Sequence, residues 1–261
     1  MSVVLETLSE AQRQSWLSLL EVAKVFPTGW CLVGGQMVHL FCAERNFTPV
    51  RPTDDGDVAL DVRAHPHILA DFTQILIELG FAPSGASPEG HQHRWVRASA
   101  SLDLLVPQDI GTRAAGRTGA TGGTTIESPG AQQALARSEE VTVRVAKAIG
   151  VIRRPNLLGA LVSKAAAYSV PVDRHKQRHM VDFAALAAIT RRSDQIARQL
   201  TARDHRYLVP MIAALESSRG VWSGMENAAR GIHALAGLLG TSGTPGNPPS
   251  PQSGSPSSPL C

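Results

Sequence analysis

Residues 51–58 have the sequence Arg51-Pro52-Thr53-Asp54-Asp55-Gly56-Asp57-Val58 and lead into an apolar alternation over Val58–Val62. This alternation predicts a β-strand. Asp55 and Asp57 are two positions apart at its entrance, so both side chains project from one face, with Cα atoms about 6.5–7 Å apart. Carboxylates this close repel each other unless a cation lies between them. Mg²⁺ prefers one or two carboxylates together with substrate phosphates, so the pair is a candidate metal site; an Asp-rich turn before a strand is the alternative.

A third acidic residue, Asp103, interrupts a second apolar run, Ser101–Val106. Burying a carboxylate in an apolar strand costs free energy unless it is paired with a cation or bound to a metal. If this strand lies beside the first one, Asp103 completes a cluster of three carboxylates with Asp55 and Asp57. The alternative is a strand whose acidic face is open to water.

Two glycines, Gly34-Gly35, separate an expected strand at Trp30–Val33 from an expected helix at Gln36–Ala43. Glycine lets a phosphate approach the backbone closely, and a helix N-terminus offers unpaired N–H groups to an anion. The turn is therefore a candidate phosphate site, with an ordinary strand–helix turn as the alternative. Its spacing matches neither the P-loop nor the dinucleotide-binding glycine pattern.

The remaining patterns predict an α+β part followed by helices. Helices are expected at Ser9–Phe26, where Ser9 and Gln12 fit a capping box, and at His67–Leu79. Strands are expected at 91–97, 101–106 and 141–145, the first two forming a hairpin, and residues 111–123 are an expected surface loop. Asn156 is the expected N-cap of a helix ending at Tyr168, and further helices are expected at 173–190, 193–201, 205–216 and 225–239.

We therefore expect an α/β domain over residues 1–150, a helical domain over 151–239 and a disordered Gly/Ser/Pro-rich tail over 240–261. The composition, with 43% hydrophobic and 18% charged residues, excludes wholesale disorder. We expect no transmembrane helix and no signal peptide, because no apolar run of about 18 residues is present and the N-terminus lacks a basic region followed by an apolar one. Three scattered cysteines favour a cytoplasmic location, and the net charge of +3 permits nucleic-acid binding without requiring it.

The order of these features resembles the nucleotidyltransferase superfamily, whose fold is that of the DNA polymerase β palm. In that family a glycine turn holds nucleotide phosphates, and three acids hold two Mg²⁺ ions. Gly34 and Gly35 match the glycine turn, Asp55 and Asp57 the acid pair, and Asp103 the third acid. The resemblance implies an α+β fold: an N-terminal palm-like mixed sheet with flanking helices, followed by a C-terminal helical bundle.

Residues 51–57 also resemble the Arg-x-Thr-x-Asp-x-Asp form of the AbiEii-type branch, which contains toxins of toxin–antitoxin and phage-defence systems. Two later segments also resemble this branch. Residues 157–165 resemble its lysine-bearing helix, in which Lys164 is the lysine, and residues 178–186 resemble its helix with a central acid, which here is Asp182. The resemblance implies that Lys164 contacts the triphosphate and that Asp182 orients it or the metal site. It assigns nucleotide binding to Gly34, Gly35, Thr53 and Lys164.

Each of the two helical residues has an alternative interpretation. Lys164 could be a lysine that extends along an Ala-rich helix to reach water. Asp182 could form an ion pair on the helix surface with Arg178, four positions earlier. The choice between Asp54 and Asp55 as first metal ligand is open, because Gly56 stands where the family usually has an aliphatic residue and a glycine loosens a strand.

The implied activity is transfer of a nucleoside monophosphate from an NTP to an acceptor hydroxyl, with two Mg²⁺ ions for which Mn²⁺ can substitute. A tRNA 3′ end is the leading acceptor, and a toxin role would imply a cognate antitoxin. A small molecule of the aminoglycoside type and a protein are the alternative acceptors. A catalytically inactive NTP-binding or interaction module is the alternative of another class, motivated by Gly56 and by Gly35 at the position where the family often has a serine hydroxyl.

Other kinds of site are disfavoured. His175 and His179 have the spacing of a zinc helix, but the segment is crowded with basic residues and lacks the glutamate of a metalloprotease. His91 and His93 fit a solvated strand edge better than a ligand pair. The chain has no Gly-x-Ser-x-Gly elbow and no Cys-x-x-Cys pair.

Overall fold

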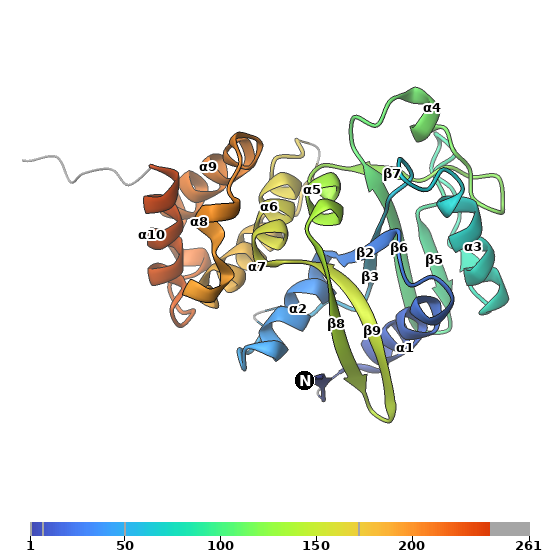
Figure 1. The fold of residues 1–261 in the computed structure, drawn as a ribbon, viewed down its shortest axis with the longest axis horizontal. Helices are drawn as coiled ribbons and strands as arrows, with labels where there is room; N and C mark the ends of the chain where they lie inside the picture. Colours follow the sequence, from blue (N-terminus) through green and yellow to red (C-terminus); the bar gives the residue numbers. More distant parts are fainter. Residues whose placement is uncertain (1, 7, 50, 172, 241–261) are drawn as a thin grey trace, which may run out of the picture.

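The computed structural model describes residues 2–6, 8–49, 51–171 and 173–240. Its centre is a mixed sheet with strand order β2-β3-β6-β5-β4, in which β7 also pairs with β6 (Figure 1). The strands are β2 (Trp30–Val33), β3 (Gly56–Leu60), β4 (Ala82–Pro83), β5 (Arg94–Arg97), β6 (Ala100–Pro107) and β7 (Ile126–Ser128). Strand β3 is antiparallel to β2 and parallel to β6, whereas β5 and β6 form the predicted antiparallel hairpin. A second sheet has the order β1-β8-β9, with β1 (Val3–Leu5), β8 (Ser138–Val145) and β9 (Ala148–Pro155).

Helices cover both faces of the central sheet, because its middle strands β2, β3 and β6 carry buried apolar side chains on both sides. One face, with Leu32, Val58 and Leu60, joins the main core beneath the first three helices. These are α1 (Glu10–Val25), α2 (Gly34–Glu44) and α3 (Ile68–Glu78). The other face is covered by the short helix α5 (Ala131–Ala136), whose Ala131 packs near Val33. The capping box predicted for the first helix is present, since the Ser9 hydroxyl accepts the N–H of Gln12.

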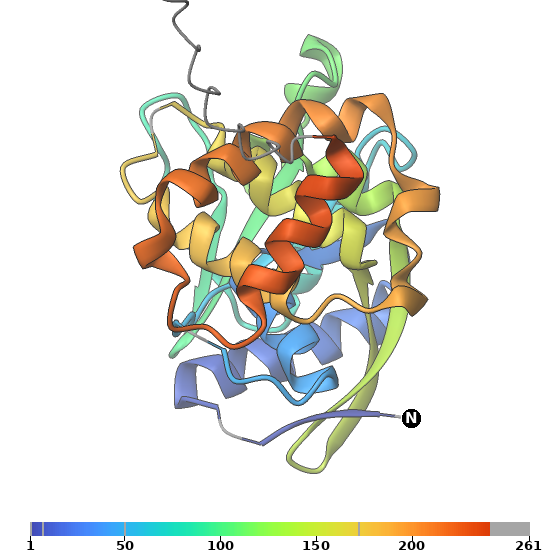
Figure 2. The ribbon, with the colours of Figure 1, turned by 90° about the vertical axis from the view of Figure 1, so that its left-hand side faces the viewer.

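The C-terminal part is helical, as predicted. It contains α6 (Leu157–Tyr168), α7 (Gln177–Ala188), α8 (Ile196–Gln199), α9 (Ala202–Ser217) and α10 (Ala228–Leu239), with 3₁₀ turns at Arg192–Asp194 and Arg219–Val221. Helices α6 and α7 lie between the sheet and the outer helices α8, α9 and α10, and α10 is at the front of Figure 2. The Asn156 side chain caps α6 by accepting the N–H of Gly159 at 3.0 Å, which confirms the predicted start.

Several predicted boundaries were wrong. Helix α7 begins at Gln177 instead of 173, because the Asp173 carboxylate accepts the N–H of His175 and stabilises a turn there. Strand β5 begins at Arg94 instead of 91, and the expected loop at 111–123 contains the short helix α4 (Thr112–Ala115). Residue 150, the expected limit of the α/β domain, falls within β9, and the division into domains stays a prediction. All of the predicted tail after residue 240 lies outside the described residues.

The described helices include none with both the length and the apolar character needed to cross a bilayer.

Helices α7 and α10 approach so closely at Gly231 that any side chain there would overlap the Ala187 carbonyl oxygen. We therefore expect Gly231→Ala to lower the free energy of unfolding by about 2–3 kcal/mol, because the helices must separate. Urea unfolding measures the loss. Gly220→Ala is the matched control, since a Cβ at Gly220 meets open space. Equal stabilities of the two variants would contradict the close packing.

Candidate active site

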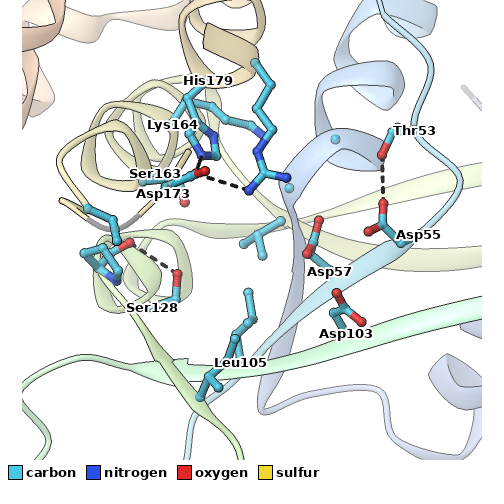
Figure 3. Close-up of a pocket in the computed structure, with 18 of the residues that line it drawn as sticks. Thr53, Asp55, Asp57, Asp103, Leu105, Ser128, Ser163, Lys164, Asp173 and His179 are labelled. Carbon is cyan, nitrogen blue, oxygen red and sulfur yellow. Dashed lines mark hydrogen bonds and ion pairs between the residues drawn. The ribbon is translucent and has the colours of Figure 1, made fainter. Parts of the chain in front are cut away.

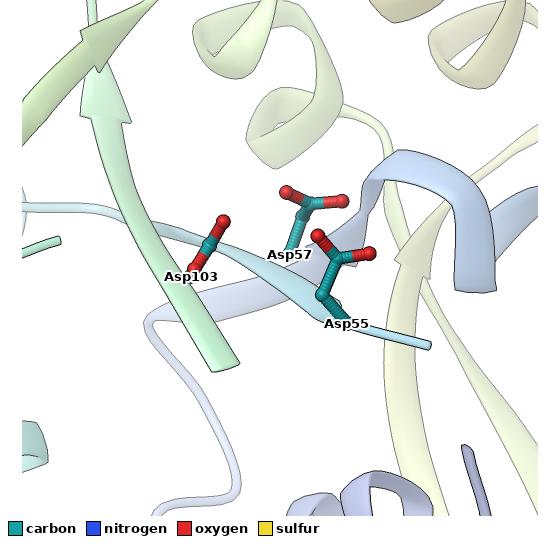
Figure 4. Close-up of side chains that lie close together, drawn as sticks. All are labelled: Asp55, Asp57 and Asp103. Carbon is teal, nitrogen blue, oxygen red and sulfur yellow. The ribbon is translucent and has the colours of Figure 1, made fainter. Parts of the chain in front are cut away.

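Three carboxylates converge at one end of the central sheet, as predicted (Figure 4). Asp57 on β3 and Asp103 on β6 are direct neighbours in the parallel register, and Asp55 lies just before β3. One oxygen from each of the three lies within 4.8 Å of the others. The neighbouring Asp54 carboxylate instead accepts the Ser9 hydroxyl at 2.7 Å, so Asp55 is the residue that joins the cluster.

Gly56, the departure from the family pattern, is explained by packing. A Cβ at this position would lie 2.9 Å from Leu102 Cδ2 and 3.3 Å from Leu19 Cδ1, closer than ordinary contact. The glycine therefore lets β3 pack tightly against α1 and β6. It does not disturb the register, because Gly56 pairs with Leu102 and Asp57 with Asp103.

The Gly34-Gly35 turn lies directly against the acidic cluster. Gly34 has a φ of +67°, and a side chain there would overlap the Asp57 carboxylate. A side chain at Gly35 would overlap Thr53, whose hydroxyl donates to Asp55 at 3.0 Å. The Gly35 N–H donates to Asp57. The two glycines thus bring the N-terminus of α2 against the carboxylates, and this leaves room for a ligand on the open side.

We expect Gly34→Ala to abolish Mn²⁺ binding, because the new methyl group would displace the Asp57 carboxylate. Isothermal titration with Mn²⁺ measures the loss. Gly111→Ala is the control for backbone strain alone, since Gly111 has a φ of +83° with open space around its Cβ position. Wild-type Mn²⁺ affinity in Gly34→Ala would show that the contact with Asp57 is unimportant.

Burial dominates the electrostatics of the cluster. Desolvation, together with the nearby charges of Asp55 and Asp103, raises the pKa of Asp57 to about 7, although Lys164 acts in the opposite direction. A carboxyl group whose pKa lies near neutral pH has too little positive charge around it, so a bound cation would stabilise its ionised form.

Lys164 and Asp182 form a buried ion pair opposite the carboxylates. Lys164 Nζ lies 2.7 Å from Asp182 Oδ2, and the two side chains are 5% and 4% exposed. The guanidinium of Arg51 binds both oxygens of Asp182, through Nε and Nη2, at 2.7 Å each. Burial opposes ionisation of Asp182, but Lys164 and Arg51 outweigh it and lower the pKa of that carboxyl.

These contacts exclude the surface alternatives stated for the two helical residues. Lys164 does not extend to water, because its ammonium is buried against Asp182. Asp182 does not pair with Arg178, which binds Asp173 at 3.2 Å. Arg51 belongs to the motif that precedes Asp55, so this network joins the sheet to helices α6 and α7.

Asp173 also accepts a hydrogen bond from His179 Nε2 at 2.8 Å. Burial, together with Lys164 and despite Asp173, lowers the pKa of His179 to about 4, so the ring is neutral at physiological pH. The His179 ring is thus engaged with a carboxylate, and in the described part of the chain the three aspartates are the only group placed to share a metal ion.

Arg94 is a site residue that the sequence analysis missed. Its Nε and Nη2 bind the two oxygens of Asp103 at 2.8 and 2.7 Å, and Nη2 also lies 3.3 Å from Asp55 Oδ2. The signal was available in part, because a hairpin of these two strands was predicted. The observed register pairs Arg97 with Ala100 and sets Arg94 opposite Asp103.

The site residues described above, apart from Asp54, Gly56 and Asp182, line a cavity of about 430 Å³ between the sheet and helix α6 (Figure 3). Its floor is acidic, with Asp55, Asp57 and Asp103, and the basic side chains of Lys164 and Arg51 line it as well. The remaining lining includes apolar side chains, among them Val33, Leu105, Ile126 and Pro129. Carboxylates suit a hard cation, basic groups suit phosphate oxygens, and apolar side chains suit a flat ring. The cavity therefore has the chemistry to bind a metal–nucleotide complex.

No protein-family model and no curated protein sequence matches the chain. Among solved structures, the chain is similar to an antigenic nucleotidyltransferase-like protein from Paracoccidioides brasiliensis, with a TM-score of 0.50 and 17% identity over 87% of this chain and 99% of that one. The antibiotic-resistance factor ANT(2'')-Ia matches with a TM-score of 0.44 and 15% identity, over 82% of this chain and 99% of that one. The first similarity confirms the predicted fold class: the chain has a nucleotidyltransferase fold with a C-terminal set of helices.

Proposed function

We propose that this protein is a nucleotidyltransferase that moves a nucleoside monophosphate from an NTP to an acceptor hydroxyl. The observation that carries the proposal is the pairing, across one cavity, of three carboxylates and a glycine turn with the buried Lys164. Separately, each feature has a structural explanation. Together they provide a place for a cation, for phosphate oxygens and for an attacking hydroxyl.

The acidic cluster fits Mg²⁺. Its donors are hard carboxylate oxygens close enough to share an ion, and desolvation and the charges of Asp55 and Asp103 raise the pKa of Asp57. Asp55 and Asp57 would hold both ions of a two-ion site, Asp103 would hold one of them, and Mn²⁺ can replace Mg²⁺. When bound, the metal neutralises phosphate charge and makes the acceptor hydroxyl easier to deprotonate.

The chain's own residues bind the triphosphate and accept the proton of the acceptor hydroxyl. The triphosphate would be bound by the backbone of Gly34 and Gly35, the Thr53 hydroxyl and the Lys164 ammonium, while Asp182 fixes Lys164 in place. The Gly35 N–H and the Thr53 hydroxyl would then exchange Asp57 and Asp55 for phosphate oxygens. The acceptor oxygen forms a bond to the α-phosphorus, and the bond from that phosphorus to the bridging oxygen breaks. Pyrophosphate leaves with the electron pair, and Asp103 takes the acceptor's proton. Catalysis of this kind is mainly positioning and charge neutralisation.

A tRNA 3′ end is the acceptor that we propose, on the resemblance of residues 51–57 and of the helices bearing Lys164 and Asp182 to the AbiEii-type branch. The alternatives are a small molecule of the aminoglycoside type and a protein. The inactive-module alternative loses one of its two motives, because Gly56 has a packing role and leaves the cluster intact.

Transfer can be tested directly. The protein is incubated with each α-labelled NTP, Mg²⁺ and total tRNA, and in parallel with aminoglycosides and with a protein extract. We expect label on tRNA for the wild type and none for Asp57→Asn. Unlabelled tRNA with a labelled alternative acceptor would overturn only the tRNA assignment. Nucleotide binding without transfer to any acceptor would favour the inactive module.

A toxin role follows from the same resemblance and is tested in cells. We expect induced expression of the wild-type chain to arrest growth and Asp55→Ala to relieve the arrest at equal protein level. A cognate antitoxin would suppress the arrest. Normal growth with the wild-type protein would contradict the toxin role without affecting the transferase proposal.

A further inference from the structure

Asp57, Asp103 and Arg94 form one row across three neighbouring strands. Asp57 on β3 pairs with Asp103 on β6, and Asp103 pairs with Arg94 on β5. Directly opposite residues of neighbouring strands project from the same face of a sheet. The backbone register thus fixes a guanidinium beside the acidic cluster.

Arg94 is hydrogen-bonded to both carboxylate oxygens of Asp103, the atoms that would coordinate a metal ion. The fork of Nε and Nη2 binds both carboxylate oxygens at 2.8 and 2.7 Å, and Nη2 extends to Asp55 at 3.3 Å. Asp57 instead accepts the N–H of Gly35. A divalent ion therefore meets Asp57 free of the guanidinium, whereas it must compete with Arg94 for Asp103 and for one oxygen of Asp55.

Arg94 is also free to leave. Its side chain is 45% exposed, whereas that of Asp103 is 11% exposed. An exposed guanidinium can rotate into water, and a divalent ion that arrives at Asp103 replaces the positive charge, so the buried carboxylate is not left without a partner. With Arg94 in place, one positive charge faces three ionised carboxylates. The two negative charges that remain are balanced by one divalent ion.

We propose that Arg94 is a built-in competitor for divalent cations, so that the nucleotide-free site binds one ion tightly and takes a second only when Arg94 leaves Asp103. This inference rests on the proposed function, because it assumes that the cluster is a metal site. It assigns Arg94 a regulatory role: metal occupancy at Asp103 is coupled to movement of an exposed side chain.

The test counts Mn²⁺ ions in the absence of nucleotide, by the loss of the free-ion electron paramagnetic resonance signal. We expect one tightly bound ion in the wild type. Arg94→Gln should bind two, or bind its ions at least about fivefold more tightly, because like charges in contact repel even at a water-like dielectric. Arg94→Lys, which keeps the charge, should stay closer to the wild type.

Two further variants keep the outcomes distinct. Arg178→Gln removes a cation of similar exposure, 50%, from the same cavity, but this cation is paired with Asp173, so we expect wild-type Mn²⁺ binding. Asp57→Asn should lose Mn²⁺. If Arg94→Gln binds Mn²⁺ as the wild type does while Asp57→Asn loses it, the role of Arg94 is wrong and the metal site stands. If no form binds Mn²⁺, the proposed function fails and this inference fails with it.

Discussion

The Asp57→Asn variant is expected to lose about a thousandfold in the rate of nucleotidyl transfer. Asp57 is the direct neighbour of Asp103 in the sheet and contacts the Gly34-Gly35 turn, so its loss removes a metal ligand and a negative charge from the site. Single-turnover transfer at saturating NTP measures the effect. Asp54→Asn is the matched control, because this adjacent carboxylate binds Ser9 outside the cluster, and it should stay within about twofold of the wild type. Similar losses in both variants would contradict the assignment.

The same variant should be more stable than the wild type when metal is absent. The pKa of Asp57 is about 7 in the folded protein, above its ordinary value of 3.8, so the wild type loses stability as the pH rises from about 4 to 7. Asparagine has no such loss. We expect the advantage of Asp57→Asn, measured by urea unfolding in a chelator, to be small at pH 4 and to reach a few kcal/mol at pH 8. An advantage that does not change with pH would contradict burial of the charge.

Lys164→Met is expected to weaken NTP binding by about 10- to 100-fold, the loss of a charged hydrogen bond to phosphate. It should also lower the free energy of unfolding by about 2–3 kcal/mol, because the buried Asp182 keeps only Arg51 as a partner. Nucleotide titration and urea unfolding measure the two effects.

A double variant separates the two roles. Lys164→Met combined with Asp182→Leu replaces the buried ion pair with apolar side chains, so it should recover most of the lost stability. It should still bind NTP as weakly as the single variant. Recovery of NTP affinity with stability would show that Lys164 acts only as a structural residue.

Local signals in the sequence were sufficient for the elements that carry the site. The Ser9 and Asn156 caps, the apolar run of β2 and the strand expected at Val58–Val62 depend on neighbouring residues alone. The structure confirms the caps and both strands, although β3 covers Gly56–Leu60 and its Ala59 is buried as well. The convergence of Asp55, Asp57 and Asp103 needed the additional assumption that β3 and β6 are neighbours, which the family resemblance provided.

Features that depend on distant partners were missed. Strand β1 has three residues and exists because it pairs with β8, more than a hundred positions away. Strand β9 leaves Ile149 and Val151 exposed, so its pattern does not indicate a buried face. The ion pair of Asp182 with Arg51 joins two segments 131 positions apart, and no helical spacing could have revealed it.

The central claim is that one cavity holds a divalent ion on the aspartates and a triphosphate between the glycine turn and Lys164. A crystal structure with Mn²⁺ and a non-hydrolysable NTP analogue tests it most directly, because the anomalous scattering of Mn²⁺ locates the ion. We predict an anomalous peak coordinated by Asp55 and Asp57, with the triphosphate against Gly34, Gly35 and Lys164. Nucleotide bound elsewhere, or Mn²⁺ absent from Asp57, would contradict the account.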